Sequence, residues 1–338
     1  MGLSVSAASL ALSGNPRIPE VTRERVREAA EQLGYAPNGA ARALRARRHD
    51  AIGLLVFDPN SALGLSFYSD AVLAVADEAL CQEMGMVLVN ARPRAGVAFS
   101  KTLSSSRIDG AVCIGGGFTS EAARVLERRG LPYIFIGKCE LPGMQVPYVS
   151  TDYAQGARLA TDHLLALGHR RIAVVAQPHD RERAWIRERI AGHGLALSAR
   201  GLPPEAGPLL ELPISPDTAD DDPAWQARKW LKAGITAVFV ADYGLTAHML
   251  RALRLQRIDV PRQMAVVGFD DPPGAELFVP PLTAVRQPLA ALGAAAARTV
   301  MAWAAGAPRE PEVATLPATL VVRQSCGASQ ALNGHSRN

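Results

Sequence analysis

The sequence predicts an α/β protein with two similar lobes, preceded by a small helical segment. From Ala51 onward, short apolar runs alternate with helical stretches, which is the pattern of a parallel sheet covered on both faces. The alternation comes as two successive series with a pause near residues 138–151. Residues 1–50 carry a net charge of +3, whereas the other residues carry +1. A basic front end on a nearly neutral body indicates a polyanion-binding module joined to a second function.

Two helices are predicted before residue 34. In the stretch 22–33, Val26 and Leu33 fall at helical spacing with two alanines between them, Thr22 can cap the start, and Gly34 ends the helix. Upstream, residues 3–12 form a second short helix, which the turn residues at 13–16 end.

A basic linker follows these helices. Pro37 keeps Ala36 out of helical geometry, and Asn38 can cap the short alanine-rich segment after it. Leu44 lies on one face of that segment among four arginines. A short helix with so little core needs another surface to hold it, and DNA phosphate is the natural partner for its arginines.

The body has seven predicted strands and seven predicted helices in alternation. The strands are 52–57, 86–90, 110–114, 133–136, 172–176, 237–240 and 264–269. The helices are 68–83, 120–129, 152–167, 183–192, 223–233, 245–256 and 289–306.

Cysteine usage and hydropathy indicate a reducing compartment. The four cysteines are scattered, without a C-x-x-C or metal-ligand spacing, as expected of small core residues in the cytoplasm. No segment reaches the length of a transmembrane helix. Residues 2–13 are apolar enough to imitate a signal-peptide core, but a positive stretch before them is lacking. We therefore predict a cytoplasmic protein with no membrane partner.

Several sequence blocks, in the right order, resemble the lactose-repressor (LacI) family of transcription regulators. Residues 33–45, LGYAPNGAARALR, resemble the family's hinge motif Y-x-P-N-x-x-A-R-x-L. Further matching blocks are IGLLV at 52–56, RIDG at 107–110, AQGARLATDHLLALGHRRI at 154–172, VPRQMAVVGFDD at 260–271 and PPLTAVRQP at 280–288. The resemblance covers essentially the whole chain. It implies a partial helix-turn-helix headpiece followed by a two-lobed, periplasmic-binding-protein-like (Rossmann-like) effector domain.

The resemblance also implies domain boundaries. Residues 1–37 would be a DNA-binding headpiece that lacks its first helix, and residues 38–50 would be the hinge helix and linker. An effector-binding and dimerisation domain would span residues 51–326, followed by a disordered tail at 327–338. Its first lobe would comprise 51–153 and 285–312, and its second lobe 154–284 and 313–326.

DNA contacts are expected from two short helices. By the resemblance, the contacting residues are Ser4, Val5, Ser6, Ser9, Asn38, Ala41, Arg42, Leu44 and Arg45. Leu44 would be the apolar wedge that opens a base step in the minor groove. The alternative for the hinge is a surface linker whose arginines merely keep it soluble.

Effector contacts are expected where strands end, because open parallel sheets bind ligands beyond the carboxyl ends of their strands. The resemblance assigns these contacts to Phe67, Tyr68, Arg183, Asp242, Asp270 and Gln287. Arg183 best matches the family's effector arginine in the pattern R-x-x-G-aromatic, although Ile186 stands where the pattern has glycine.

Asp270 could instead cap the next segment, and Arg183 could be a solvated helix residue. A one-residue shift of the match would substitute Glu182 for Arg183 or leave Arg181 as the donor. Gly137-Lys138 stands where many relatives carry an aspartate after the fourth strand, so the effector can differ from a plain neutral hexose.

The predicted function is a homodimeric transcription regulator, a repressor, that binds an operator in double-stranded DNA under the control of a sugar-like small molecule. No catalytic constellation, cofactor or metal site stands out, so an enzyme is not expected. One alternative is a solute-binding protein with the same body fold. Another is a regulator that has lost direct DNA binding.

Overall fold

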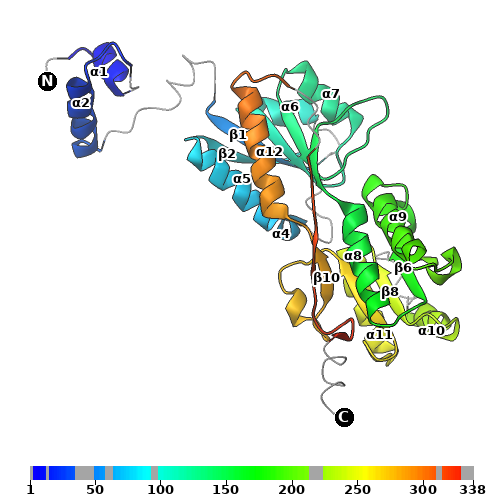
Figure 1. The fold of residues 1–338 in the computed structure, drawn as a ribbon. Helices are drawn as coiled ribbons and strands as arrows, with labels where there is room; N and C mark the ends of the chain where they lie inside the picture. The colour runs from blue at the N-terminus through cyan, green and yellow to red at the C-terminus, as the bar shows by residue number, and fades with distance from the viewer. Residues whose placement is uncertain are drawn as a thin grey trace. The chain divides into compact units, whose positions relative to one another are not determined.

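The computed structural model describes residues 3–12, 15–34, 49–57, 64–92, 98–212, 224–309 and 314–328. The chain divides into two compact units, residues 1–50 and 51–338 (Figure 1). Of the predicted segments, the hinge helix at 38–48 and the tail at 329–338 lie outside the described residues. No helix in the described ranges is long and apolar enough to span a membrane.

The first unit consists of two helices, α1 (Val5–Leu12) and α2 (Glu20–Gln32). Ala11 of α1 and Val26 of α2 are the buried apolar residues of this small unit. Gly34 follows α2 with a φ of +60°, a left-handed conformation that glycine adopts without steric cost, and it ends the helix as predicted.

The first lobe of the second unit is built on a sheet of six parallel strands. In spatial order they are β11 (Ala314–Leu316), β5 (Tyr148–Thr151), β4 (Tyr133–Ile136), β3 (Gly110–Ile114), β1 (Ala51–Val56) and β2 (Gly85–Asn90). Its helices are α4 (Gly64–Phe67), α5 (Ser69–Cys81), α6 (Phe99–Ser105), α7 (Ser120–Arg128) and α12 (Leu289–Ala304).

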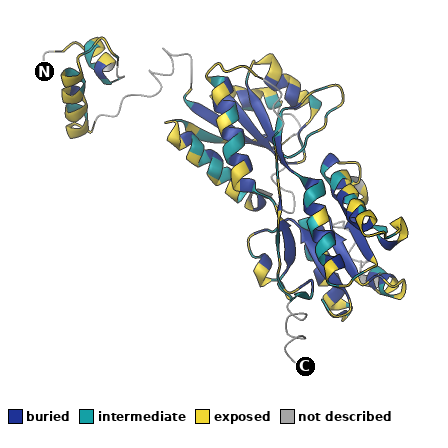
Figure 2. Ribbon diagram, in the orientation of Figure 1, coloured by how far each residue is buried: buried dark blue, intermediate teal, exposed yellow. Residues whose placement is uncertain are grey.

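Every residue of β1 is buried, because helices cover both faces of the sheet (Figure 2). Side chains alternate along a strand, so Leu54 packs with residues of α5 and α12 on one face. Leu55 packs with residues of α6 and α7 on the other face. A continuous apolar run is therefore the expected signature of this strand.

The second lobe repeats this design. Its strands, in spatial order, are β12 (Thr319–Val321), β10 (Thr283–Arg286), β9 (Ala265–Phe269), β8 (Ala237–Val240), β6 (Ile172–Ala176) and β7 (Leu209–Glu211). Its helices are α8 (Tyr153–Ala166), α9 (Ala184–Ala199), α10 (Ala224–Lys232) and α11 (Tyr243–Leu255). Three short 3₁₀ turns complete it, η1 (Pro178–Asp180), η2 (Pro204–Ala206) and η3 (Ala275–Leu277). The β10–β12 pair is antiparallel, and the other pairs are parallel.

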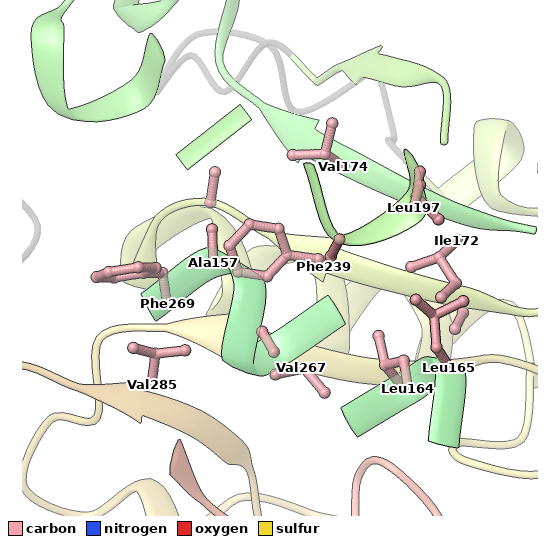
Figure 3. Close-up of a cluster of buried hydrophobic side chains, with 14 of the residues drawn as sticks. Ala157, Leu164, Leu165, Ile172, Val174, Leu197, Phe239, Val267, Phe269 and Val285 are labelled. Atoms are coloured by element: carbon pink, nitrogen blue, oxygen red, sulfur yellow. The ribbon is translucent and has the colours of Figure 1, made fainter. Parts of the chain in front are cut away.

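Figure 3 shows one core of this lobe, where Val174, Phe239 and Val267 of three neighbouring strands face helices α8 and α9. The opposite side chains of the same strands, such as Val175 and Val238, pack with α10 and α11.

The chain passes between the lobes three times. The passages follow β5, β10 and β11, at about residues 152, 287 and 317. The third differs from the prediction, because β11 pairs with β5 and so belongs to the first lobe. The predicted boundary at residue 312 lies too early, since a three-residue strand at a sheet edge has little hydrophobic pattern to identify it.

Candidate functional site

The residues that follow three neighbouring strands of the second lobe converge on Asp270. This carboxylate comes directly after β9, is 2% exposed, and has a φ of +77°, a strained conformation for a residue other than glycine. Gln287, which follows β10, donates from Nε2 to Asp270 Oδ1 at 2.5 Å. Its Oε1 accepts from the Thr151 hydroxyl of the first lobe at 2.7 Å. The site therefore joins both lobes at their crossing segments.

Arg189 of α9 supplies the positive charge of this site. Its guanidinium nitrogens lie 3.5 Å from the two carboxylate oxygens of Asp270, and Nη1 donates to the carbonyl of Ala241 at 2.5 Å. The side chains of Arg189 and Asp270 are each 3% exposed. A strong charge-assisted hydrogen bond is about 2.7–2.9 Å long, so this pair is held apart. Arg189 Nε is buried without a hydrogen-bond partner in the described part of the chain.

Aromatic rings enclose the guanidinium of Arg189. Its central carbon lies 3.6 Å from the ring centroid of Phe269, 4.8 Å from that of Trp185 and 5.0 Å from that of Tyr153. Such contacts stabilise a desolvated cation through the negative face of the ring. Burial raises the pKa of Tyr153 to about 12, so its hydroxyl keeps its proton at neutral pH. The arrangement offers donors, acceptors and aromatic faces to a polar ligand.

Asp242 begins α11 directly beyond β8. Its Oδ1 accepts from the backbone amide of Leu245 at 3.0 Å, so it is the N-cap of the helix. Burial is the main cause that raises its pKa, and the nearby carboxylate of Asp270 adds to this. Asp242 therefore borders the site while performing a structural role. Two carboxylates around one buried arginine favour a neutral ligand rich in hydroxyl groups over an anion.

Arg183 does not join this cluster. It is the N-cap residue of α9, its Nε lies 2.5 Å from Asp180 Oδ1, and its side chain is 43% exposed. Its Nη1 also donates to the carbonyl of Gly116 in the first lobe at 3.3 Å. Arg183 therefore lies outside the buried cluster, where Arg189 is the arginine beside Asp270, and its predicted effector contact stays a prediction.

A signal in the sequence could have identified Arg189. The family pattern of an arginine followed three residues later by glycine occurs as Arg189-Ile190-Ala191-Gly192. The next position holds His193 where the pattern has an aromatic residue, and this substitution concealed the match.

The predicted pair Phe67 and Tyr68 lies between two helices of the first lobe: Phe67 ends α4, and Tyr68 is the N-cap residue of α5. Phe67 is buried in the core, and its ring meets Tyr68 edge-on at 4.9 Å between centroids. Tyr68 is partly buried against the same core. The core role, rather than ligand stacking, accounts for the position of Phe67.

Asp271 is distinct from its neighbour Asp270. Its side chain is 1% exposed, and it accepts from Arg286 at the end of β10 and from Arg323 beyond β12, at 2.6 Å in each case. Asp271 therefore links the end of β10 to the segment beyond β12 through two ion pairs.

The predicted DNA-reading residues of the first unit lie on α1 and just before it. Ser4, Val5 and Ser6 are exposed, Val5 to 89%. The Ser4 hydroxyl also accepts from the Ala7 amide at 3.2 Å, and so caps the helix. Ser9 belongs to α1, but its side chain lies outside the description, as do the hinge residues Asn38, Ala41, Arg42, Leu44 and Arg45.

Two family models match the chain. Residues 1–38 match the model of bacterial regulatory proteins of the lacI family, and residues 161–326 match a periplasmic binding protein-like domain. The HTH-type transcriptional regulator CelR of Thermobifida fusca is 34% identical over 96% of this chain and 95% of its own. Catabolite control protein A of Priestia megaterium is 26% identical over 96% of both chains.

Solved structures agree with these relatives. The transcriptional regulator CelR in complex with cellobiose superposes with a TM-score of 0.68 at 31% identity, covering 96% of both chains. The lac repressor dimer bound to operator superposes with a TM-score of 0.72 at 25% identity, again covering 96% of both chains. CelR is named as a transcriptional regulator in both comparisons.

Proposed function

This chain belongs to the lacI family of bacterial regulatory proteins, and we propose that it is a DNA-binding transcriptional repressor controlled by a neutral sugar. The sugar binds between the lobes, at Arg189, Asp270 and Gln287. The observation that carries this proposal is the buried Arg189–Asp270 pair, which is stretched to 3.5 Å and leaves Arg189 Nε without a hydrogen-bond partner among the described residues. Hydroxyl groups of a sugar, each both donor and acceptor, satisfy such a site.

The relatives narrow the class of sugar. CelR was solved with cellobiose, and another regulator of this family, from Enterococcus faecium, was solved with ribose. The two carboxylates at this site disfavour an anionic effector, whereas carboxylates and a guanidinium together suit vicinal hydroxyl groups. We therefore expect a neutral glucoside such as cellobiose, and ribose is the second candidate.

Coupling to DNA follows from the topology. The sugar contacts groups from both lobes, so it favours one relative arrangement of them. That arrangement biases the segment at 38–48 and the headpiece at 1–37, and the coupling is reciprocal: DNA alters sugar affinity by the same factor by which sugar alters DNA affinity. As a repressor that binds DNA, the protein works in the cytoplasm.

The functional unit is a homodimer, as in the lac repressor structure on its operator. Exposed leucines of the first lobe indicate which surface forms the dimer contact. Leu73 and Leu80 of α5 are 62% and 75% exposed, and they lie seven residues apart on one side of the helix. Leu88 of the adjacent edge strand β2 is 53% exposed. An exposed apolar group of this kind is typical of a protein–protein contact.

Calorimetric titration with cellobiose and ribose tests the site. Arg189→Gln removes the buried donor and should lower sugar affinity by at least about thirtyfold, since a hydrogen bond to a charged group is worth about 1.5–3 kcal/mol and Asp270 also loses its partner. Arg200→Gln, at the exposed C-terminal end of the same helix, is the matched control and should change affinity by less than about threefold. Equal losses in both variants, or unchanged binding in Arg189→Gln, would refute the site.

A further inference from the structure

Two ion pairs of opposite polarity connect the lobes beside the Arg189 site. Lys138, two residues beyond β4 in the first lobe, pairs through Nζ with Glu188 of α9 in the second lobe. Arg187 of α9 donates from Nη2 to Glu140 of the first lobe at 2.6 Å. Each lobe thus contributes one positive and one negative group.

The arrangement of these four charges favours one alignment of the two lobes. Lys138 and Glu140 are two residues apart, and their partners, Glu188 and Arg187, are adjacent on α9 and follow in the reverse order along the chain. Sliding one lobe so that Lys138 met Arg187 would bring like charges together, which disfavours the shifted arrangement. The pairs are therefore specific for the arrangement in which they occur.

The Lys138–Glu188 pair is the stronger of the two. Its side chains are 26% and 30% exposed, whereas those of Arg187 and Glu140 are 49% and 50% exposed and more fully screened by water. The hydrogen bond to Glu188 is the main cause that raises the pKa of Lys138, so the ammonium stays charged at neutral pH.

The stronger pair adjoins the effector site. The Tyr153 hydroxyl lies beside Gly137, the residue before Lys138, since a Cβ atom on Gly137 would be 3.5 Å from it. The Tyr153 ring faces the Arg189 guanidinium at 5.0 Å. When the lobes close, the Lys138–Glu188 ion pair and the Arg189 cluster therefore form next to each other. Unlike the three covalent crossings, these side-chain contacts separate when the lobes open.

We propose that Lys138–Glu188 and Glu140–Arg187 form an electrostatic latch that favours the closed arrangement of the two lobes before any effector binds. The latch sets how much of the protein is competent to hold the sugar, because a ligand of the closed form binds with an affinity reduced by the fraction that is open. This consequence for sugar affinity rests on the proposed function. The latch itself is a property of the lobes alone.

The distance between the lobes tests the latch without any ligand. Spin labels on cysteines replacing the exposed residues Arg124 of α7 and Arg200 at the end of α9 report the separation, in a background with Cys81 and Cys139 replaced by serine. Labelled chain is diluted with unlabelled chain so that only distances within one chain are measured. The closed-to-open ratio is compared in the parent, Lys138→Glu, Glu188→Lys and the double swap.

The latch predicts a specific order of results. Each single reversal should lower the closed-to-open ratio by about three- to tenfold, which corresponds to the loss and inversion of one partly exposed ion pair, and the double swap should restore it to within about twofold. Arg181→Glu is the matched control, since Arg181 pairs with Glu211 inside the second lobe at 3.5 Å, and it should leave the ratio unchanged. Identical distance distributions in the parent and in Lys138→Glu would overturn the latch. A double swap that unfolds at the same temperature as the parent but does not restore the closed-to-open ratio would overturn it as well.

Cellobiose titrations then separate the latch from direct contact. The latch predicts a dissociation constant that rises in Lys138→Glu by no more than the change in closure and recovers in the swap. If the swap restores closure but not cellobiose affinity, Lys138 and Glu188 touch the sugar, and their assignment as a latch alone is overturned. If the parent binds neither cellobiose nor ribose, the proposed effector class fails, whereas the label distances still decide the latch.

Discussion

At the scale of the residue, the buried pair of Asp270 and Arg189 connects packing with function. Both charges are buried, and in such a pair the desolvation cost is repaid only by good geometry and additional hydrogen bonds. Here the pair is long, at 3.5 Å, and Asp270 adopts a left-handed backbone conformation. Residues held in this way concentrate at ligand sites, where the surrounding structure maintains the strain.

The position of Asp270 could be predicted from the sequence, whereas that of Arg189 was missed. Asp270 follows a buried strand in the block VVGFDD, and strand ends are where such sheets bind ligands. Arg189 lies inside a helix, six residues after Arg183, and its sequence context resembles that of a solvated helix face. Its burial depends on the close approach of α9 to the strands, which is a tertiary effect that local pattern does not encode.

His193 predicts an acid-sensitive stability. Burial lowers the pKa of His193 from its ordinary 6.5 to about 4, with the backbone of Ile172 partly opposing this. As pH falls from 6.5 to 4, the unfolded chain takes up a proton that folded His193 refuses, so the free energy of unfolding decreases across this window and levels off below it. A shift of this size corresponds to about 3 kcal/mol.

Urea denaturation between pH 7 and pH 4 measures this loss. The decrease should be smaller by about 3 kcal/mol in His193→Gln than in the parent. His169→Gln is the control, because His169 is only partly buried and hydrogen-bonded to Thr236, and it should retain most of the decrease. A His193→Gln profile parallel to that of the parent would contradict the assignment.

At the scale of the element, the close contact between helices α9 and α8 determines the position of α9. A Cβ atom on Gly192 would lie 2.2 Å from the carbonyl oxygen of Ala154, so only glycine permits this contact. Gly194, two residues later on the same helix, has no atom within 4 Å of such a Cβ. The two glycines therefore differ in packing while sharing the same helical backbone.

Alanine substitutions at these glycines should have opposite effects. Gly192→Ala should lower the free energy of unfolding by about 2–3 kcal/mol, because the two helices must separate. Gly194→Ala should raise it by about 0.5–1 kcal/mol, since alanine is the better helix former. Chemical denaturation of both variants checks this, and a stabilisation of similar size in each would show that helix propensity, not packing, governs Gly192.

Element prediction succeeded where burial dominates the pattern. The predicted strands at 110–114, 133–136, 172–176 and 237–240 agree with β3, β4, β6 and β8 in both ends, because fully buried parallel strands are continuous apolar runs. Helix α9 extends to Ala199 instead of ending at Gly192, since packing against α8 outweighs the low helix propensity of glycine. The strands β5, β7, β10 and β11 were not predicted, because each is short and includes polar residues, so that none forms a continuous apolar run.

At the scale of the whole molecule, the exposed leucines of the first lobe predict a dimer contact. Replacing Leu80 by glutamate places a charge where an apolar surface would be buried, and should shift the protein from dimer to monomer at micromolar concentration. Leu195 of α9 is 55% exposed and serves as the matched control, so Leu195→Glu should stay dimeric. Sedimentation velocity distinguishes the two, and a dimeric Leu80→Glu would place the contact elsewhere.

The central claim is that sugar bound at Arg189 and Asp270 controls DNA binding by the basic front end of the chain. The most direct test is the affinity of the protein for the promoter DNA beside its own gene, measured by fluorescence anisotropy with and without saturating cellobiose at fixed ionic strength, because salt alone changes such affinities strongly. We predict that the sugar changes the affinity of the parent by about 5- to 150-fold, as typical allosteric couplings do, and changes that of Arg189→Gln by less than twofold although its affinity without sugar is normal. An equal response of parent and variant would contradict the account, because the sugar would then act through another site.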